Sequence, residues 1–257
     1  MDELIGKVAG MIRESQRVVV FTGAGVSTES GISDFRSPGG IWSRYDPEDF
    51  TIQRFVADRE ARKRNWRLRR ELVTANYQPN AAHRAIAELE RIGKLSCVIT
   101  QNIDGLHHTA GNTEAAIVEL HGTMKDAKCL SCDDRLSLIQ VLGRIDQGEE
   151  DPHCRKCGGL LKAATVSFGE AMPEREMRRA EECSRECDLF IVIGSSLVVF
   201  PAASMPLIAK RAGATLVIIN STPTDMDSAA DVVIHGMAGS VMEAIMEQVR
   251  GQRSGPA

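Results

Sequence analysis

Six short apolar stretches, each followed by a small or polar residue, constrain the fold of this chain more than any other feature. They are rich in β-branched residues and lie at 17–23, 95–102, 116–122, 189–196, 215–221 and 231–236. Continuous apolar runs of this length are typical of strands that are covered on both faces, as in a parallel sheet.

Helical patterns separate several of these stretches. In residues 79–93, Ala82, Ile86 and Leu89 share one helical face. Gly93 follows as a typical stop signal. Strands that alternate with helices indicate βαβ units. The sequence therefore predicts an α/β fold with a doubly wound parallel sheet, in which ligands bind beyond the carboxyl ends of the strands.

Two stretches interrupt this pattern and are predicted to form a smaller second lobe. Residues 37–78 hold both tryptophans and a basic helical run at 58–72, and residues 124–165 are rich in cysteine and glycine. The larger domain is then assembled from residues 1–36, 79–123 and 166–257. Residues 251–257 are expected to form a frayed tail.

Charge and hydropathy exclude several classes of protein. The 257 residues carry a formal net charge of −4, so we expect no global basic face for nucleic acid. Residues 1–17 alternate charged and apolar residues at helical spacing and lack the features of a signal peptide. No run approaches the roughly 18 uninterrupted apolar residues of a membrane span. We therefore expect a cytoplasmic protein that binds neither membranes nor, directly, nucleic acid.

Two cysteine pairs give the most specific local signal. Cys129-x-x-Cys132 and Cys154-x-x-Cys157 are separated by 21 residues, a spacing typical of tetrahedral zinc sites. Disulfides are the alternative, but they are disfavoured in a cytosolic chain. Four protein ligands leave no position for water, so the expected Zn²⁺ is structural. The remaining cysteines are interpreted as core or ordinary surface residues: Cys97, Cys183 and Cys187.

The loop after the first apolar stretch, "GAGVSTESG", contains half of a dinucleotide-binding fingerprint. Gly23-x-Gly25 indicates a place where another group approaches the main chain, and a structural turn is about as consistent with it as a phosphate site. Asp34, Phe35 and Arg36 follow in the same loop. A guanidinium group suits a phosphate or a local carboxylate.

A second polar cluster follows the stretch at 95–102. Gln101, Asn102 and Asp104 could hold ribose hydroxyls or a carboxamide. Each residue taken singly could also be a turn former or a helix cap. Together with the glycine loop, these side chains favour a nucleotide site.

The motifs together resemble the sirtuin family, the NAD-dependent protein-lysine deacylases. The resemblance runs from about Val18 to about Ala244 and rests on the cysteine pairs and on "GAGVSTESGISDFRSPGGIW", "TQNIDGLHHTAG", "ELHGT", "GSSLVVFPAA" and "INSTPTDMDSAADVVIHG". It implies a large Rossmann-like domain and a small lobe made of a helical module (37–78) and a zinc ribbon (124–165). NAD and an acylated lysine of a protein or peptide would meet in the cleft between them.

The resemblance also implies residue roles. His121, at the end of "IVELHG", is expected to be the general base that deprotonates a ribose hydroxyl, with Asn102 and Asp104 as further catalytic residues. The other histidines lack this context: His83, His107, His108, His153 and His235. The expected NAD contacts are Gly23, Ala24, Gly25, Thr28, Asp34, Phe35, Arg36, Gln101, Asn102, Ile103, Asp104, Gly194, Ser195, Ser196, Asn220, Ser221 and Ala238.

For the peptide, two segments resemble those between which a substrate adds as a strand. Their candidate residues are Val166, Phe168, Gly169, Val198 and Phe200, and the apolar ones could equally belong to the core.

The chain departs from the family pattern near the expected acyl site. Residues 161–165 read "LKAAT" where many members have Arg-Pro, and Ser167 stands where an aromatic residue is common. Trp66 and Arg69 occupy the place of a Tyr-x-x-Arg pair that binds acidic acyl groups in some members. Since the tyrosine is absent, we expect acetyl or another neutral acyl group.

Three alternatives remain from the sequence. One is an enzyme of the same fold that transfers ADP-ribose to protein, and another is a non-catalytic NAD-binding scaffold, against which the presence of His121 argues. The third is a zinc-ribbon nucleic-acid binder, which the acidic residues among the basic ones near the cysteines disfavour.

Overall fold

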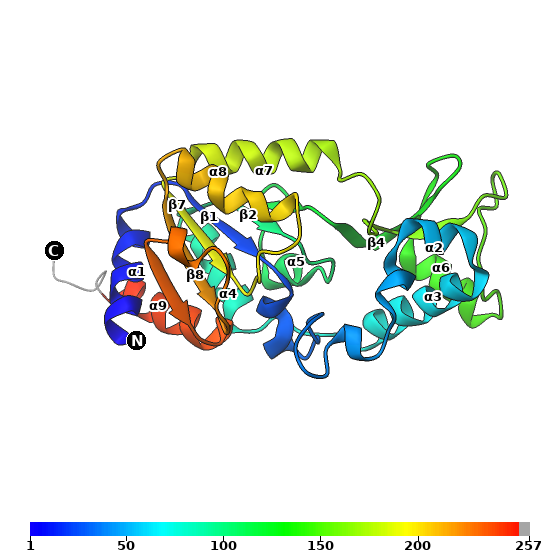
Figure 1. The fold of residues 1–257 in the computed structure, drawn as a ribbon, viewed down its shortest axis with the longest axis horizontal. Helices are drawn as coiled ribbons and strands as arrows, with labels where there is room; N and C mark the ends of the chain where they lie inside the picture. Colours follow the sequence, from blue (N-terminus) through cyan, green and yellow to red (C-terminus); the bar gives the residue numbers. More distant parts are fainter. Residues whose placement is uncertain (252–257) are drawn as a thin grey trace.

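A six-stranded parallel sheet forms the centre of the larger part of the molecule (Figure 1). In this computed structural model, which describes residues 1–251, each strand runs parallel to its neighbours. From edge to edge the strands are β3 (Ile117–Glu119), β2 (Leu95–Thr100), β1 (Val18–Thr22), β7 (Leu189–Ile193), β8 (Thr215–Asn220) and β9 (Val232–His235). The prediction of a doubly wound parallel sheet is confirmed.

The strand order places a topological switch point between β1 and β7. From this pair the order runs β1, β2, β3 in one direction and β7, β8, β9 in the other. The loops that leave the carboxyl ends of β1 and β7 therefore diverge, and ligands of open α/β sheets bind where this happens.

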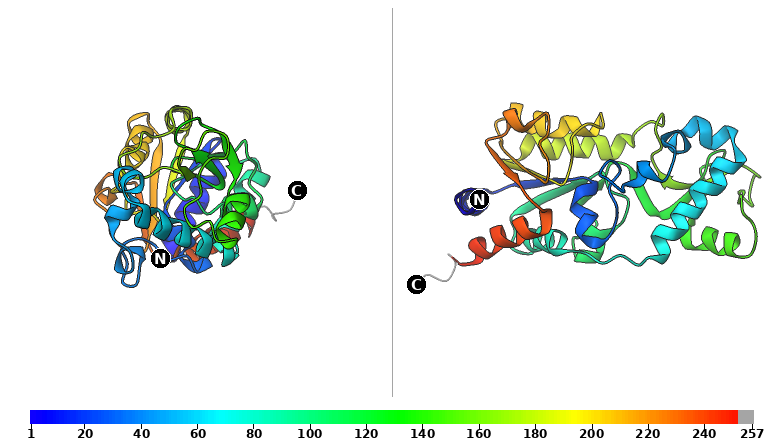
Figure 2. Two further views of the ribbon diagram at one scale, coloured as in Figure 1. Left: turned by 90° about the vertical axis from the view of Figure 1, so that its right-hand side faces the viewer. Right: turned by 60° about the horizontal axis from the view of Figure 1, so that its bottom comes forward.

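Alternate strand residues pack into two separate apolar layers, which explains why the sequence stretches are continuous. On β1, Val18 and Val20 belong to one layer, whereas Val19 and Phe21 belong to the other. Helices cover both faces (Figure 2). One face is covered by α1 (Asp2–Glu14), α4 (Ala81–Arg91) and α9 (Ala238–Gly251), and the other by α7 (Glu174–Glu186) and α8 (Met205–Arg211).

Helix α4 begins and ends at the signals found in the sequence. The side-chain oxygen of Asn80 accepts hydrogen bonds from the backbone N–H groups of Ala82 and His83. The helix ends at Arg91, and Gly93 follows with a φ of +74°. A left-handed residue at this position is the usual glycine cap of a helix.

The second lobe combines three helices with a small antiparallel sheet. Its elements are α2 (Ile52–Ala57), α3 (Arg59–Thr74), α6 (Leu138–Asp146), β4 (Gly122–Cys129), β5 (Arg135–Ser137) and β6 (Leu161–Thr165), with β4 between β5 and β6. Trp66 of α3 packs in one buried cluster with Leu138 and Val141 of α6 and Ala127 of β4. The two sequence insertions therefore share a core. Since β4 begins at Gly122, it crosses the predicted boundary at 123, and the exact division of domains stays a prediction.

Short elements complete the part of the chain that is described. They are α5 (Leu106–Ala110) and the 3₁₀ helices η1 (Ala24–Ser30), η2 (Ile41–Ser43), η3 (Pro47–Phe50), η4 (Ala202–Ser204) and η5 (Asp227–Ala229). Within residues 1–251, none of the helices has the length and hydropathy needed to span a membrane. The expected frayed tail lies outside the described residues except for Gly251, which ends α9.

Candidate active site

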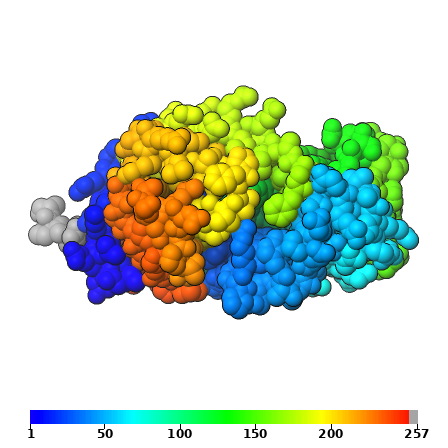
Figure 3. Space-filling model, viewed as in Figure 1, coloured from blue at the N-terminus to red at the C-terminus, as the bar shows by residue number. Residues whose placement is uncertain are grey.

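A cavity of about 720 Å³ lies where the carboxyl ends of the parallel strands face the second lobe. Figure 3 shows the surface hollowed between these two parts. A smaller cavity of about 260 Å³ adjoins it and is lined by Thr28, Asn220 and Ala238, among others. All residues expected to contact NAD line one or both of these cavities. Their roles stay predictions, but the structure brings the whole set together.

The glycines after β1 allow two loops to interlock. A Cβ atom on Gly25 would lie 2.8 Å from the backbone oxygen of Gly194, and one on Gly23 would lie 2.9 Å from the same atom. The N–H of Gly25 donates to that oxygen at 2.8 Å. The close approach inferred from the sequence is therefore present, and the group that comes close is the backbone of the loop after β7.

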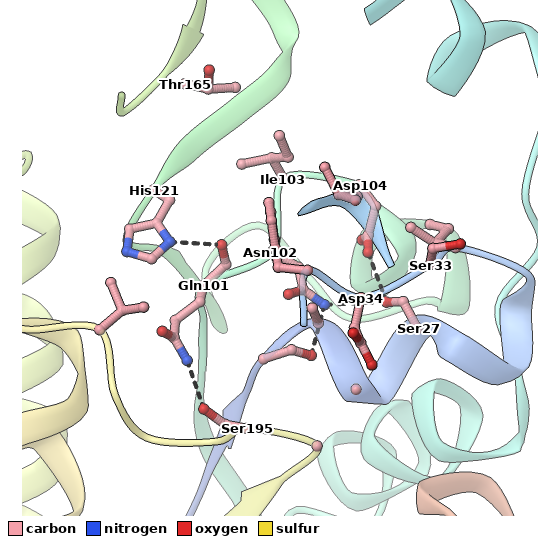
Figure 4. A pocket seen from close by; sticks show the side chains of 18 of the residues that line it. Ser27, Ser33, Asp34, Gln101, Asn102, Ile103, Asp104, His121, Thr165 and Ser195 are labelled. Atoms are coloured by element: carbon pink, nitrogen blue, oxygen red, sulfur yellow. Dashed lines mark hydrogen bonds between the residues drawn. The ribbon is translucent and has the colours of Figure 1, made fainter. Parts of the chain in front are cut away.

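Ser27, which is not among the residues predicted from the sequence, connects the polar side chains on the cavity floor. Its hydroxyl donates to Oδ2 of Asp104 at 2.7 Å and accepts from Nδ2 of Asn102 at 3.1 Å (Figure 4). The Asn102 amide also donates to the oxygen of Gly23 at 3.0 Å. Thr28, one of the expected NAD contacts, donates to the backbone oxygen of Gly25 and lines the smaller cavity. These bonds fix Asn102 and Asp104 relative to the glycine loop.

Two buried histidines lie behind this floor. Nε2 of His83 is 3.5 Å from the Ser27 hydroxyl, and Nε2 of His107 is 3.0 Å from the Thr22 hydroxyl. Burial lowers the pKa of His83 to about 4 and that of His107 to about 3. Both rings are therefore neutral near pH 7. His83 contacts Ser27 and His107 contacts Thr22 of β1, and both contacts join residues that are far apart in the sequence.

His121 follows β3 and lines the cavity as a neutral base. Its Nδ1 lies 3.0 Å from the backbone oxygen of Gln101 (Figure 4). Because a carbonyl oxygen only accepts, Nδ1 carries the proton and Nε2 carries the lone pair. Burial lowers the pKa of His121 and outweighs the hydrogen bond to Gln101, which raises it. The side chain of Gln101 donates to Ser195 at 2.9 Å, which links the loops after β2 and β7.

The loop after η1 is folded around Asp34. This carboxylate accepts hydrogen bonds from the backbone N–H groups of Arg36 and Ser37 and from the Ser37 hydroxyl, at 2.9, 2.7 and 2.6 Å. Burial alone would raise the pKa of Asp34, but these hydrogen bonds hold it below its usual value. The Arg36 guanidinium lies 3.5 Å from the Ser196 hydroxyl across the cavity. Asp34 therefore shapes the loop, and Arg36 is left facing the site.

The residues expected to bind peptide line the same cavity from the other side. Phe168, Val198 and Phe200 are 47%, 47% and 64% exposed, so the alternative that they belong to the core is wrong. The N–H of Val166 donates to the backbone oxygen of His121 at 2.8 Å. Residues 166–170, called the peptide segment below, therefore begin directly beside the candidate base.

A buried arginine lies at the deep end of the cavity. Arg69 is 7% exposed, and its NH2 group donates to the Thr165 hydroxyl at 3.3 Å. Its Nε has no hydrogen-bond partner among residues 1–251, and burial lowers its pKa to about 10. Trp66 is packed into the core of the second lobe and does not line the cavity.

A second buried cation lies beneath the peptide segment. Lys162, within "LKAAT", pairs with Glu170 at 2.8 Å, and the Ser167 N–H donates to the same carboxylate at 2.7 Å. Burial lowers the pKa of Lys162 to about 8, although Glu170 opposes this. The pair holds the turn at 167–170 in place.

The four predicted zinc ligands converge at the end of the second lobe. Their sulfur atoms all lie within 4.8 Å of one another, with Cys129 and Cys157 at 3.5 Å and Cys132 and Cys154 at 3.8 Å. Sulfurs in a tetrahedral zinc site, with Zn–S bonds of about 2.3 Å, are separated by about 3.8 Å. The geometry fits a structural Zn²⁺ and is too long for disulfides. Of the other cysteines, Cys97 lies in β2, Cys183 in α7, and Cys187 directly after it.

The cavity also fits a dinucleotide in its position and chemistry. Its volume is within the range of about 300–1,000 Å³ that is usual for small-molecule sites. Hydroxyl and amide groups of Gln101, Ser195 and Asn220 line it at the carboxyl ends of β2, β7 and β8, on both sides of the switch point. The three carboxylates that line it, Asp34, Asp104 and Glu170, each accept a hydrogen bond from the protein, and Glu170 also pairs with Lys162.

Comparisons with known proteins agree with this geometry. A model of the Sir2 family matches residues 23–201. The chain is 50% identical over 240 residues to NAD-dependent protein deacetylase 1 of Bradyrhizobium diazoefficiens, covering 93% of each chain. It is 45% identical to NAD-dependent protein deacetylase of Thermodesulfovibrio yellowstonii, covering 98% of this chain and 97% of that one. A solved complex of Sir2 with a p53 peptide and NAD⁺ superimposes with a TM-score of 0.86 at 35% identity, covering 96% of this chain and 98% of that one.

Proposed function

The chain belongs to the Sir2 family, and we propose that it removes acyl groups from protein lysine side chains in an NAD-dependent reaction. The observation that carries the proposal is the position of His121. Its unprotonated Nε2 belongs to a ring placed between the polar floor of the dinucleotide cavity and the segment at 166–170. A base at this junction can act on a ribose hydroxyl while an acylated lysine enters beside it.

The residues of the chain divide the chemistry between them. When bound, NAD supplies the ADP-ribosyl group that accepts the acyl group, and with one water molecule the reaction gives nicotinamide, acyl-ADP-ribose and free lysine. Asn102 and Asp104 are held by Ser27, so they can orient the ribose and the carboxamide. His121 Nε2 takes the proton of a ribose hydroxyl, and its Nδ1–H stays on Gln101. The four cysteines, none of which lines the cavity, would hold Zn²⁺ as a structural metal.

The acyl preference follows from the deep end of the cavity. We expect acetyl or another neutral acyl group, since Trp66 offers no hydroxyl to a carboxylate and does not line the cavity. The buried Arg69 favours a second candidate, an acidic acyl group, because it has no carboxylate partner within the described residues. A cytoplasmic location is retained as part of the proposal, because reducing conditions keep the four cysteines available as thiolates.

A panel of acetylated, propionylated and succinylated peptides, incubated with and without NAD, tests these statements by mass spectrometry. We expect NAD-dependent loss of the acyl mass with formation of acyl-ADP-ribose, fastest for acetyl-lysine. Arg69→Met is the matched variant: it should leave deacetylation active, whereas any desuccinylation should be lost. Addition of ADP-ribose to protein without deacylation would favour the transferase alternative. Binding of NAD without turnover of any peptide would favour the scaffold alternative.

A further inference from the structure

A row of aromatic rings links the loop at the NAD cavity to the peptide segment. The ring centroids of Phe35 and Trp42 are 5.0 Å apart, and those of Trp42 and Phe50 are also 5.0 Å apart. The ring of Phe168 lies 6.3 Å from that of Trp42. These separations are within the range of favourable aromatic pairs. Trp42 therefore contacts the three other rings.

Backbone hydrogen bonds join Trp42 to Phe35 at one end of this row and Phe168 to Phe50 at the other. The N–H of Trp42 donates to the oxygen of Phe35 at 3.1 Å, so Trp42 is bound to the loop that lines the NAD cavity. At the other end, the N–H of Phe168 donates to Phe50 at 3.0 Å, and the N–H of Ile52 donates to Phe168 at 2.9 Å. The packing of the Trp42 ring joins these two hydrogen-bonded pairs.

Both ends of the row are accessible to a ligand. Phe35 lines the large cavity next to Asp34 and Arg36, and Phe168 exposes 47% of its surface at the edge of the same cavity. A ligand that fixes one end stabilises the packed arrangement of Trp42 and thereby the other end. The second ligand then loses less conformational entropy on binding.

We propose that Trp42 is a positioning residue that couples the binding of acylated peptide to the binding of NAD. This inference rests on the proposed function, because it takes Phe35 as part of the NAD site and Phe168 as part of the peptide site. The coupling is reciprocal: peptide raises the affinity for the nucleotide by the same factor by which the nucleotide raises the affinity for peptide. Without the Trp42 ring, the two segments respond to their ligands separately.

Calorimetric binding tests this without turnover. ADP-ribose is titrated into the protein alone and into the protein saturated with an acetyl-lysine peptide, and the peptide is titrated in the same two ways. ADP-ribose lacks nicotinamide, so the complex cannot react. We expect each ligand to tighten the other roughly five- to a hundredfold in the unmodified chain, the usual range of coupling between two sites. In Trp42→Leu the factor should fall towards one, and Trp42→Phe should restore part of it.

Phe55→Leu is the matched control. Phe55 is a fully buried ring in α2 of the same lobe, so its loss loosens the lobe without removing a ring from the row. We expect this variant to keep the coupling factor of the unmodified chain even if its melting temperature falls. Coupling that survives in Trp42→Leu, or that is lost equally in Phe55→Leu, overturns the inference while the proposed function stands. Failure of the unmodified chain to bind either ligand overturns the proposed function and the inference with it.

Discussion

The Nδ1 atom of His121 and the backbone oxygen of Gln101 are 3.0 Å apart, and this contact determines which nitrogen of the ring is basic. Gln101 follows β2 and His121 follows β3, so the register of two parallel strands fixes the tautomer. The imidazole ring is thereby oriented by a backbone group at the carboxyl end of β2.

The pH dependence of activity should report this histidine. Only neutral His121 can accept a proton, and burial lowers its pKa below the ordinary value of 6.5. Acidification therefore has to pass below pH 6.5 before the base is lost. We expect the acid limb of kcat/KM for deacetylation to lie below pH 6.5 in a profile measured from pH 5 to 8. A limb centred above that value would contradict the neutral, desolvated ring.

Replacing the base should separate binding from chemistry. His121→Ala should lose deacetylation by roughly 10²- to 10⁴-fold, the usual contribution of a general base, and should keep its affinity for ADP-ribose. The protein should remain folded, since His121 faces a cavity. Thermal melting, ADP-ribose titration and deacetylation on one preparation check this. Joint loss of folding and activity would assign His121 a structural role instead.

Cleavage of nicotinamide should depend on the residues held by Ser27. Asn102→Ala and Asp104→Asn should each slow the exchange of labelled nicotinamide into NAD by about 10²- to 10³-fold, as for loss of a positioned electrostatic contact. Asp126→Asn is the matched control, because it removes a carboxylate from β4 outside the cavity. Exchange at the unmodified rate in both site variants would exclude them from this step.

Metal removal should unfold the second lobe. Structural zinc contributes on the order of 10 kcal/mol to the folding of small metal-bound modules, so Cys129→Ser should lose the metal and the activity together. Cys183→Ser changes a cysteine outside the cluster and should retain one zinc per chain. Metal content by elemental analysis, alongside activity, distinguishes the two. Full metal content in Cys129→Ser would mean that the ligand set is wrong.

The buried pair beneath the peptide segment should matter for stability. Glu170→Gln removes the carboxylate partner of the buried Lys162, which should cost about 3 kcal/mol, at the lower end for a broken buried pair. Lys128 also contacts Glu170, at 3.3 Å, but it is partly exposed, so Lys128→Met should cost less than about 1 kcal/mol. Urea unfolding measures both. Equal effects of the two variants would show that burial of Lys162 does not decide the energetics.

The sequence alone predicted the large sheet well because both faces of its strands are buried. On β7, Leu189, Ile191 and Ile193 enter one apolar layer and Phe190 and Val192 enter the other, which leaves a continuous apolar signature. The cysteine pairs were equally informative, since metal ligation demands a fixed spacing. In both cases the physical requirement is local in the sequence.

The features that were missed depend on contacts between distant residues. β5 (Arg135–Ser137) is short and partly exposed, so its sequence carries no strand pattern. Ser27 is one of several hydroxyl residues in its loop, and its partner Asp104 lies 77 positions away. Nothing near His83 and His107 in the sequence shows that their rings meet behind the cavity floor. Such residues have no distinguishing neighbours until the fold is known.

The interlocked backbones of Gly23, Gly25 and Gly194 have a consequence for how mutational data on this protein should be read. A Cβ on Gly194 would lie 2.2 Å from the nitrogen of Val26, so a side chain at any of the three positions forces the loops after β1 and β7 apart. In a saturation mutagenesis screen these sites should tolerate substitution as poorly as the base itself, although none of them moves a proton. Intolerance to substitution at these three glycines therefore measures how tightly the two backbones fit. It should not be used to rank residues by their contribution to catalysis.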